Sequence, residues 1–127
     1  MLLEERMRTI SEAICAMHGA TCQFSYTHEF APTVNWQQCV DVAVTAAINV
    51  VGAEKVDGNV AQMMISEDFG AFLQKIPGCF IFLGNGDSSD AQGNTPLHNA
   101  CYDFNDEILL TGAEYFAEVV RTRLPQE

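Results

Sequence analysis

The chain has few basic residues for its size. It carries 6 lysines and arginines against 17 aspartates and glutamates in 127 residues, which gives a formal net charge of -11. Proteins that bind nucleic acids or anionic membrane surfaces do so through basic patches. The composition therefore argues against both classes of partner, and the large negative charge favours solubility.

A membrane-spanning segment and a secretion signal are also missing. Glu4, Glu5, Arg6 and Arg8 interrupt the N-terminal apolar residues, which is not the pattern of a signal peptide. The longest apolar-rich stretch, residues 40–51, is too short and too interrupted to cross a bilayer. The 5 cysteines form no C-x-x-C pair, and they are expected to be buried, reduced thiols. These features predict a cytoplasmic protein.

No complete metal-binding or phosphate-binding motif is present. The sequence has no Gly-rich phosphate loop, and no second histidine, cysteine or carboxylate lies at a recognised zinc spacing from His98. The acidic stretch from Asp87 to Asp90 does not have the spacing of an EF-hand, and no glutamate closes it. We expect a surface loop there. By spacing alone, a lone loop histidine such as His98 is more often a non-ligand than a ligand.

The residues that are present predict an α/β chain. An apolar content of 48% is typical of a globular chain. Strict alternation predicts one strand, and a nearly continuous apolar run predicts another that is buried on both faces. The expected order alternates about four helices with three or more strands. It is helix 2–18, strand 21–30, helix 36–51, residues 60–65 as a strand or an extended approach to the next helix, a short helix that ends near residue 76, strand 79–83 and helix 105–124. The break at Ala31-Pro32 marks a module boundary.

Polar residues at the expected helix starts have a structural explanation. Ser66 is placed to cap the short helix, with Glu67 and Asp68 in its first turn, where negative charge suits the helix dipole. Asn35 and Asn105 are expected to cap the second and the last helix. Capping accounts for both acids without any catalysis.

Apolar stripes predict which helix faces are buried. The stripe on the first helix is expected to pack in a core and consists of Leu3, Met7, Ile10, Ile14 and Met17. The last helix is expected to bury Leu109, Ala113, Phe116, Ala117, Val120 and Leu124. His28 lies on the apolar side of strand 21–30. It is either a tolerated, partly buried histidine or a polar group that faces a substrate cleft.

Five short motifs occur in a fixed order in the second half of the chain. They are Ser66-Glu67-Asp68-Phe69, Pro77-Gly78, Gly84-Asn85-Gly86, Leu97-His98-Asn99 and Tyr102-Asp103-Phe104-Asn105-Asp106. This series resembles the C-terminal end of the metal-dependent amidohydrolases of the hippurate hydrolase and N-acyl-amino-acid amidohydrolase type, a group that includes aminoacylase and carboxypeptidase G-like enzymes.

The resemblance implies roles for individual residues. His98 corresponds to one ligand of a two-metal site that holds zinc, manganese or nickel, and Glu67, Asp68 and Asn99 would line the wall of the pocket. The other ligands and the general base belong to N-terminal motifs that these 127 residues do not contain. We therefore expect a C-terminal fragment that holds no metal tightly and does not itself cleave the small N-acyl amino acids that are the family's substrates.

The resemblance also implies a fold and an assembly. The parent would be a zinc-peptidase-like α/β fold, with residues 1–31 as the last helix and strand of a lid or dimerisation domain and residues 32–127 as the C-terminal part of the catalytic domain. We expect a homodimer or higher oligomer in which helix 2–18 and strand 21–30 lie in the interface. The alternative is a stand-alone, non-catalytic oligomerising module derived from that fold.

Overall fold

The computed structural model describes residues 2–86 and 95–124. It divides into two compact units, Met1–Ala31 and Pro32–Glu127. The division falls at the Ala31-Pro32 break, while the assignment of the two units to a lid and a catalytic domain stays a prediction. The surface loop expected at residues 87–90 lies outside the described residues.

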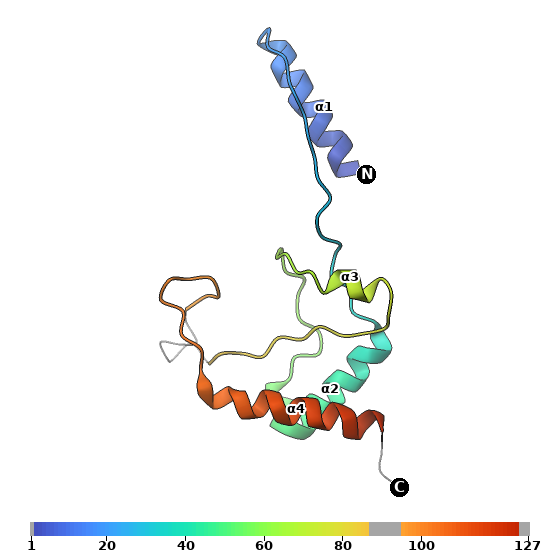
Figure 1. Cartoon of the computed structure of the whole chain (residues 1–127), viewed down its shortest axis with the longest axis vertical. Coiled ribbons are helices and arrows are strands. Elements are labelled where there is room, and N and C mark those ends of the chain that lie inside the picture. Colours follow the sequence, from blue (N-terminus) through green and yellow to red (C-terminus); the bar gives the residue numbers. More distant parts are fainter. Residues whose placement is uncertain (1, 87–94, 125–127) are drawn as a thin grey trace. The chain divides into compact units, whose positions relative to one another are not determined.

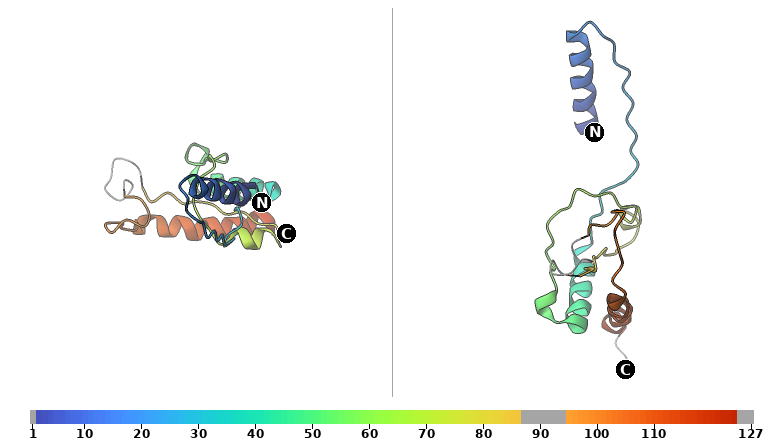
Figure 2. Two further views of the ribbon diagram at one scale, coloured as in Figure 1. Left: turned by 90° about the horizontal axis from the view of Figure 1, so that it is seen from above. Right: turned by 90° about the vertical axis from the view of Figure 1, so that its left-hand side faces the viewer.

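The first unit is a helix followed by a returning extended segment. Helix α1 spans Leu2–Met17, as its periodicity predicts. Gly19 follows with a φ of 67°, a left-handed conformation that glycine adopts readily and that ends helices. Residues 20–31 then run back alongside α1 (Figure 1), and the second viewing direction gives the same picture (Figure 2).

The apolar stripe of α1 is exposed, and the prediction that it packs in a core is wrong for this unit. No described residue of α1 is buried, and the exposed fraction reaches 73% at Leu3 and 80% at Met17. The physical reason is that a single extended segment lies beside the helix, and one segment cannot cover the whole apolar face of a 16-residue helix.

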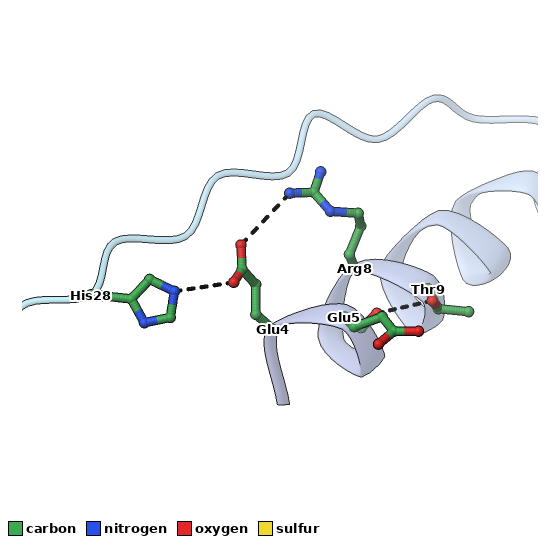
Figure 3. Close-up of polar contacts among 5 residues, drawn as sticks. All are labelled: Glu4, Glu5, Arg8, Thr9 and His28. Atoms are coloured by element: carbon green, nitrogen blue, oxygen red, sulfur yellow. Dashed lines mark hydrogen bonds and ion pairs between the residues drawn. The ribbon is translucent and has the colours of Figure 1, made fainter. Parts of the chain in front are cut away.

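Polar contacts, of which Figure 3 shows those around Glu4, and one cation–π contact join the extended segment to α1. His28 Nε2 lies 3.0 Å from Glu4 Oε2, and Glu4 Oε1 lies 4.0 Å from Arg8 Nη2. The Arg8 guanidinium stands 4.7 Å from the centre of the Phe24 ring, a cation–π distance. Tyr26 meets the His28 ring edge-on with centres 4.9 Å apart. His28 is thus neither a core residue nor a free group, because it is paired with Glu4.

This pairing predicts a pH dependence in the first unit. The hydrogen bond from His28, followed by the positive charges of His28 and Arg8, lowers the pKa of Glu4 from its ordinary value of 4.5. A lowered folded-state pKa contributes stability above the unfolded value, and that stability is lost as the pH falls through the folded value. We expect NMR contacts between residue 28 and α1 to weaken as the pH drops below 4.5. This pH dependence should be absent in Glu4→Gln. It should remain in Glu5→Gln, because the contact of Glu5 in Figure 3 is made by its backbone carbonyl, which accepts from Thr9.

The second unit is built on two packed helices. Its elements are helix α2 at Gln37–Val51, the 3-10 turn η1 at Ala53–Lys55, helix α3 at Gly70–Leu73, the 3-10 turn η2 at Asp106–Ile108 and helix α4 at Leu109–Arg123. Helices α2 and α4 lie side by side (Figure 1). The buried apolar side chains of the described chain are Ala43, Ala46 and Leu73. No helix in the described part is long and apolar enough to span a membrane.

The segments expected to be strands are extended but unpaired. Over residues 2–86 and 95–124, no segment has a hydrogen-bonded strand partner. A strand needs such a neighbour along its ladder, so the α/β class stays a prediction. At Phe80, a side chain supplies the backbone hydrogen bonds that a neighbouring strand would otherwise make. The Asn35 amide donates to Phe80 O at 2.8 Å and accepts from Phe80 N at 2.8 Å.

Asn35 therefore does not cap α2, and that prediction is wrong. The residue before the helix is Trp36, and no side chain caps the helix start, because the Asn35 amide is used on Phe80. Gly52 ends α2 with a φ of 88°, as expected. The cap predicted at Asn105 is confirmed, since its side chain accepts from Glu107 N at 3.1 Å.

Helix α4 presents to α2 a face other than the predicted one. Asn49 of α2 donates to Glu118 Oε1 at 2.9 Å, and this bond, together with Arg121, lowers the pKa of Glu118. Tyr115 and Val119 are half-buried on the same side. The predicted face is exposed instead, and we call it the outer face of α4. Its large members are Leu109, Phe116, Val120 and Leu124.

Two glycines of this unit differ in the room they leave for a methyl group. A Cβ at Gly112, inside α4, would lie 3.5 Å from Leu83, an ordinary contact. Gly112→Ala is expected to raise the free energy of unfolding by about 0.5–1 kcal/mol, since alanine is the better helix former.

A Cβ at Gly78 would lie 2.9 Å from the side chain of Leu73, which is buried. Gly78→Ala should therefore destabilise, by about 1–3 kcal/mol. Urea titrations that ranked the two variants in the opposite order would contradict this packing.

Candidate functional site

The apolar segment of residues 79–83 precedes His98 in the sequence, and it is anchored to the start of α2. Trp36 N donates to Gly78 O at 3.1 Å, and the Trp36 indole donates to Leu73 O at 2.9 Å. With the Asn35 bonds to Phe80, these contacts fix residues 78–80 against α2 and α3. The Phe69 and Phe80 rings, with centres 5.7 Å apart, add an apolar contact at the same place.

The end of this segment carries Asn85, which reaches across to residues well downstream. Its amide nitrogen donates to Asp103 O at 2.8 Å, and its amide oxygen accepts from Asn105 N at 2.8 Å. We call these three residues the Asn85 clamp. The clamp brings the Gly-Asn-Gly motif beside the Tyr-Asp-Phe-Asn-Asp motif, although they are about 20 residues apart in the sequence.

In the sequence, His98 lies between Asn85 and Asp103, two positions that the clamp joins. It is exposed, and its φ is 69°, the one positive value at a described residue other than glycine. Left-handed backbone is costly for a side chain with a Cβ, and it tends to occur at functional sites. Turns surround it, with Asn99 N donating to Pro96 O at 3.2 Å and Tyr102 N donating to Asn99 O at 3.0 Å.

The acidic turn before α3 is explained by its own backbone. Glu67 Oε1 accepts from Asp68 N at 2.9 Å and from Phe69 N at 3.2 Å. No side chain caps the start of α3, so the cap predicted at Ser66 is wrong. The Glu67 carboxylate instead folds back over free N–H groups of the turn before the helix. Asp68 is exposed and Glu67 is half-buried. Their place in a pocket wall stays a prediction.

Asn99 is likewise used locally. Its side-chain oxygen accepts from Cys101 N at 2.8 Å, which closes an Asx turn directly after His98. The amide therefore shapes the loop that carries the histidine. Its predicted role in lining a pocket is a separate matter and stays a prediction.

The described residues do not by themselves build a metal site. No group of three or more histidine, cysteine, aspartate or glutamate side chains gathers in residues 2–86 and 95–124. Glu67 is used on its own turn, and His28, in the first unit, is paired with Glu4. The site consists of one exposed imidazole on a fixed loop. The role of this imidazole as a metal ligand stays a prediction.

Sequence reasoning missed the two asparagines that hold the site together. The sequence pattern assigns Asn35 to the cap of its own helix, and it gives the Asn85 side chain no role. A usable signal was present at Asn85, because a short amide flanked by Gly84 and Gly86 can approach another backbone closely. Nothing in the sequence says which distant backbone groups it meets.

Comparison with known proteins places this arrangement in a family. The pattern that defines the family described as "Peptidase family M20/M25/M40" matches residues 5–122. Hippurate hydrolase of Campylobacter jejuni is 29% identical over 93% of this chain and 29% of its own length. Thermostable carboxypeptidase 2 of Saccharolobus solfataricus is 33% identical over 87% of this chain and 27% of its own length.

A third relative has a similar coverage. N-acetylcysteine deacetylase of Bacillus subtilis is 29% identical over 91% of this chain and 28% of its own length. The chain thus spans less than a third of the length of these relatives. No solved structure matches it significantly. The family match covers most of the chain, includes all five motifs and extends across both units, and so the chain belongs to peptidase family M20/M25/M40, a family of generally metal-dependent hydrolases that includes amidohydrolases.

Proposed function

We propose that this chain is the C-terminal portion of a metal-dependent amidohydrolase that cleaves N-acyl amino acids of the hippurate type. His98 would contribute one imidazole to a centre of zinc, manganese or nickel. The observation that carries the proposal is the exposed His98, set in left-handed backbone inside the hydrogen-bonded turn from Pro96 to Asn99. The names of two relatives, hippurate hydrolase and N-acetylcysteine deacetylase, agree with an N-acyl amino acid as substrate.

The remaining ligands would come from the part of the fold that the relatives have and these residues do not. The chain corresponds to 27% to 29% of the relatives' length. A single exposed imidazole, with no cluster of candidate ligands in residues 2–86 and 95–124, is what one piece of a shared centre would contain. Glu67, Asp68 and Asn99 remain candidates for the pocket wall in the complete fold.

Exposed apolar surface in the second unit supports the need for further chain. The outer face of α4 leaves Phe116 70% and Leu124 71% exposed. Within the apolar segment of residues 79–83, Ile81 and Phe82 are also exposed. Apolar surface gains free energy when it is removed from water, at about 25 cal/mol per Å², so these faces favour packing against more protein.

The test is to restore the missing part. A chimera would join the portion of Bacillus subtilis N-acetylcysteine deacetylase that precedes the matched region to this chain. With added Mn²⁺, Zn²⁺ or Ni²⁺, the chimera is expected to release amino acid from N-acyl substrates and to retain metal through gel filtration. His98→Ala should lower the metal content and abolish turnover, while His18→Ala, a change at an exposed histidine of the first unit, should leave both unchanged.

Two outcomes would reject the proposal. One is a folded, active chimera whose metal content and turnover are the same in His98→Ala as in the parent. The other is a folded chimera that binds metal fully and cleaves none of the N-acyl amino acids tried. Circular dichroism shows whether the chimera has folded. If it has not, the same His98 substitution is made in a full-length relative at its matching histidine.

The stand-alone oligomerising module remains the second candidate, because the stripe of α1 is exposed along its length. We propose that a second copy covers this stripe and the extended segment beside it. Light scattering at micromolar concentration is then expected to give a dimer or larger mass. Met7→Glu together with Ile14→Glu should return a monomer, because charged groups would then have to be buried. A clean monomer mass for the unaltered chain would contradict this expectation.

A cytoplasmic location is proposed from the thiols. All 5 cysteines are free, and free thiols persist in reducing compartments. Burial raises the pKa of the Cys79 thiol, and burial followed by the neighbouring Cys15 raises that of Cys22. A raised pKa leaves less of the reactive thiolate. Slow alkylation of these two cysteines relative to the exposed Cys101 would agree with this description.

A further inference from the structure

The Asn85 clamp closes the base of the stretch of chain that carries His98. The chain leaves the apolar segment at Asn85 and returns at Asp103 and Asn105, and one carboxamide bonds to both return positions at 2.8 Å. The two ends of the stretch are thus held together by a side chain and not by a strand ladder. Asn85 therefore ties the two ends of the stretch together.

The clamp is connected to His98 through consecutive turns. Tyr102 N bonds to Asn99 O, and Asn99 N bonds back to Pro96 O. Cys101 N bonds to the Asn99 side chain at 2.8 Å. Every peptide from His98 to the clamp therefore lies in or next to a hydrogen-bonded turn, and a shift of Asp103 would be passed on to the histidine.

His98 is the residue most sensitive to such a shift. Its φ of 69° is disfavoured for a residue with a Cβ. A conformation of this kind persists only where the surrounding structure fixes it. If the base of the loop opened, the simplest relaxation would be for the His98 backbone to return to negative φ, which would turn the imidazole away from its present direction.

The chemistry of the clamp selects asparagine. It needs a donor for Asp103 O and an acceptor for Asn105 N at the end of one short side chain. An ionised aspartate offers acceptors only, and glutamine is one methylene longer. Alanine offers neither group.

We propose that Asn85 is a positioning residue that fixes the backbone conformation, and hence the ring direction, of His98. The proposal rests on the metal-ligand role proposed for His98 above. Asn85 itself touches neither metal nor substrate, and it acts through the two backbone bonds at the base of the loop.

NMR on the labelled 127-residue chain, with no metal added, tests this directly. In Asn85→Ala, hydrogen-exchange protection of the Asn105 amide is expected to fall about tenfold, the change that loss of one hydrogen bond produces. The backbone couplings and the Cα chemical shift of His98 should change from values typical of positive φ to values typical of negative φ. Asn85→Asp keeps the acceptor for Asn105 N and should give a smaller loss of protection, with His98 still displaced.

The matched control is Asn35→Asp. It alters an amide that also makes two backbone bonds, both to Phe80, and it tests whether any loss of stability disturbs the histidine. The His98 signals should stay as in the parent chain. Circular dichroism accompanies each variant, and Asn85→Asp serves if Asn85→Ala does not fold.

Two results overturn the inference. His98 could keep its couplings and shift in both Asn85 variants, or it could move equally in Asn35→Asp. Because no metal is present, these readouts do not depend on whether His98 is a ligand. A folded chimera that binds metal and cleaves no N-acyl amino acid, together with a displaced His98 in the Asn85 variants, would reject the proposed function and retain the positioning role. An active chimera that depends on His98, together with an undisplaced His98 in the Asn85 variants, would do the opposite.

Discussion

A polypeptide of these 127 residues, purified and supplied with Mn²⁺, Zn²⁺ or Ni²⁺, is expected to release no amino acid from hippurate or other N-acyl amino acids above the buffer control. Metal-assisted hydrolysis needs a firmly held ion with an open position and a base within reach of its bound water. His98 is one donor, and no cluster of three candidate ligands occurs in the described ranges. Elemental analysis should find far less than one transition metal per chain.

Association between copies does not change this expectation. A symmetric dimer could at most bring two copies of His98 together, which gives a two-histidine site without a base. Glu67 is used by its own turn, and His28 is bound to Glu4. Full-length N-acetylcysteine deacetylase serves as the positive control for the assay. Turnover by the short chain that disappeared in His98→Ala would mean that these residues assemble a complete site.

Asn35→Ala is expected to destabilise the second unit strongly, by about 2–3 kcal/mol. The substitution leaves both Phe80 N and Phe80 O without the partners that now lie at 2.8 Å. Both groups are partly buried, and a polar group that loses its partner away from water pays its desolvation cost in full. The second unit has only a small core, centred on Ala43, Ala46 and Leu73, and this core offsets little of that loss.

Chemical denaturation of three variants would measure the effect. Asn35→Asp retains an acceptor for Phe80 N and should lose roughly half as much as Asn35→Ala. Gln37→Ala removes an exposed side-chain pair with Asp41 on the same helix and should change the free energy of unfolding by less than about 0.5 kcal/mol. Equal effects of Asn35→Ala and Gln37→Ala would show that the Phe80 bonds are not formed in solution.

Local signals predicted the helices well. Periodicity and a terminal glycine located α1 at Leu2–Met17 and α2 at Gln37–Val51, within one or two residues of expectation. The Asn105 cap also follows from residues next to it in the sequence. Each of these features depends on groups a few residues apart, where spacing determines geometry.

Features that depend on distant partners were not predictable. The Asn35 amide meets a backbone 45 residues away, so the cap expected from its local position did not form. Helix α4 has apolar residues on more than one side, and the sequence pattern identified the outer face, while Asn49 and Glu118 determine the side that meets α2. At the site, the motif indicated His98, but the clamp that holds its loop depends on contacts across about 20 residues.

The outer face of α4 has a practical consequence for handling the protein. Exposed side chains such as Phe116 and Leu124 attract other copies, whereas a net charge of -11 repels them. Repulsion between surface charges reaches about 10 Å at 0.1 M salt and about 3 Å at 1 M. Added salt, or acid near the carboxyl pKa range, is therefore expected to favour precipitation. Purification at low ionic strength and neutral pH is the condition under which the chain stays dispersed.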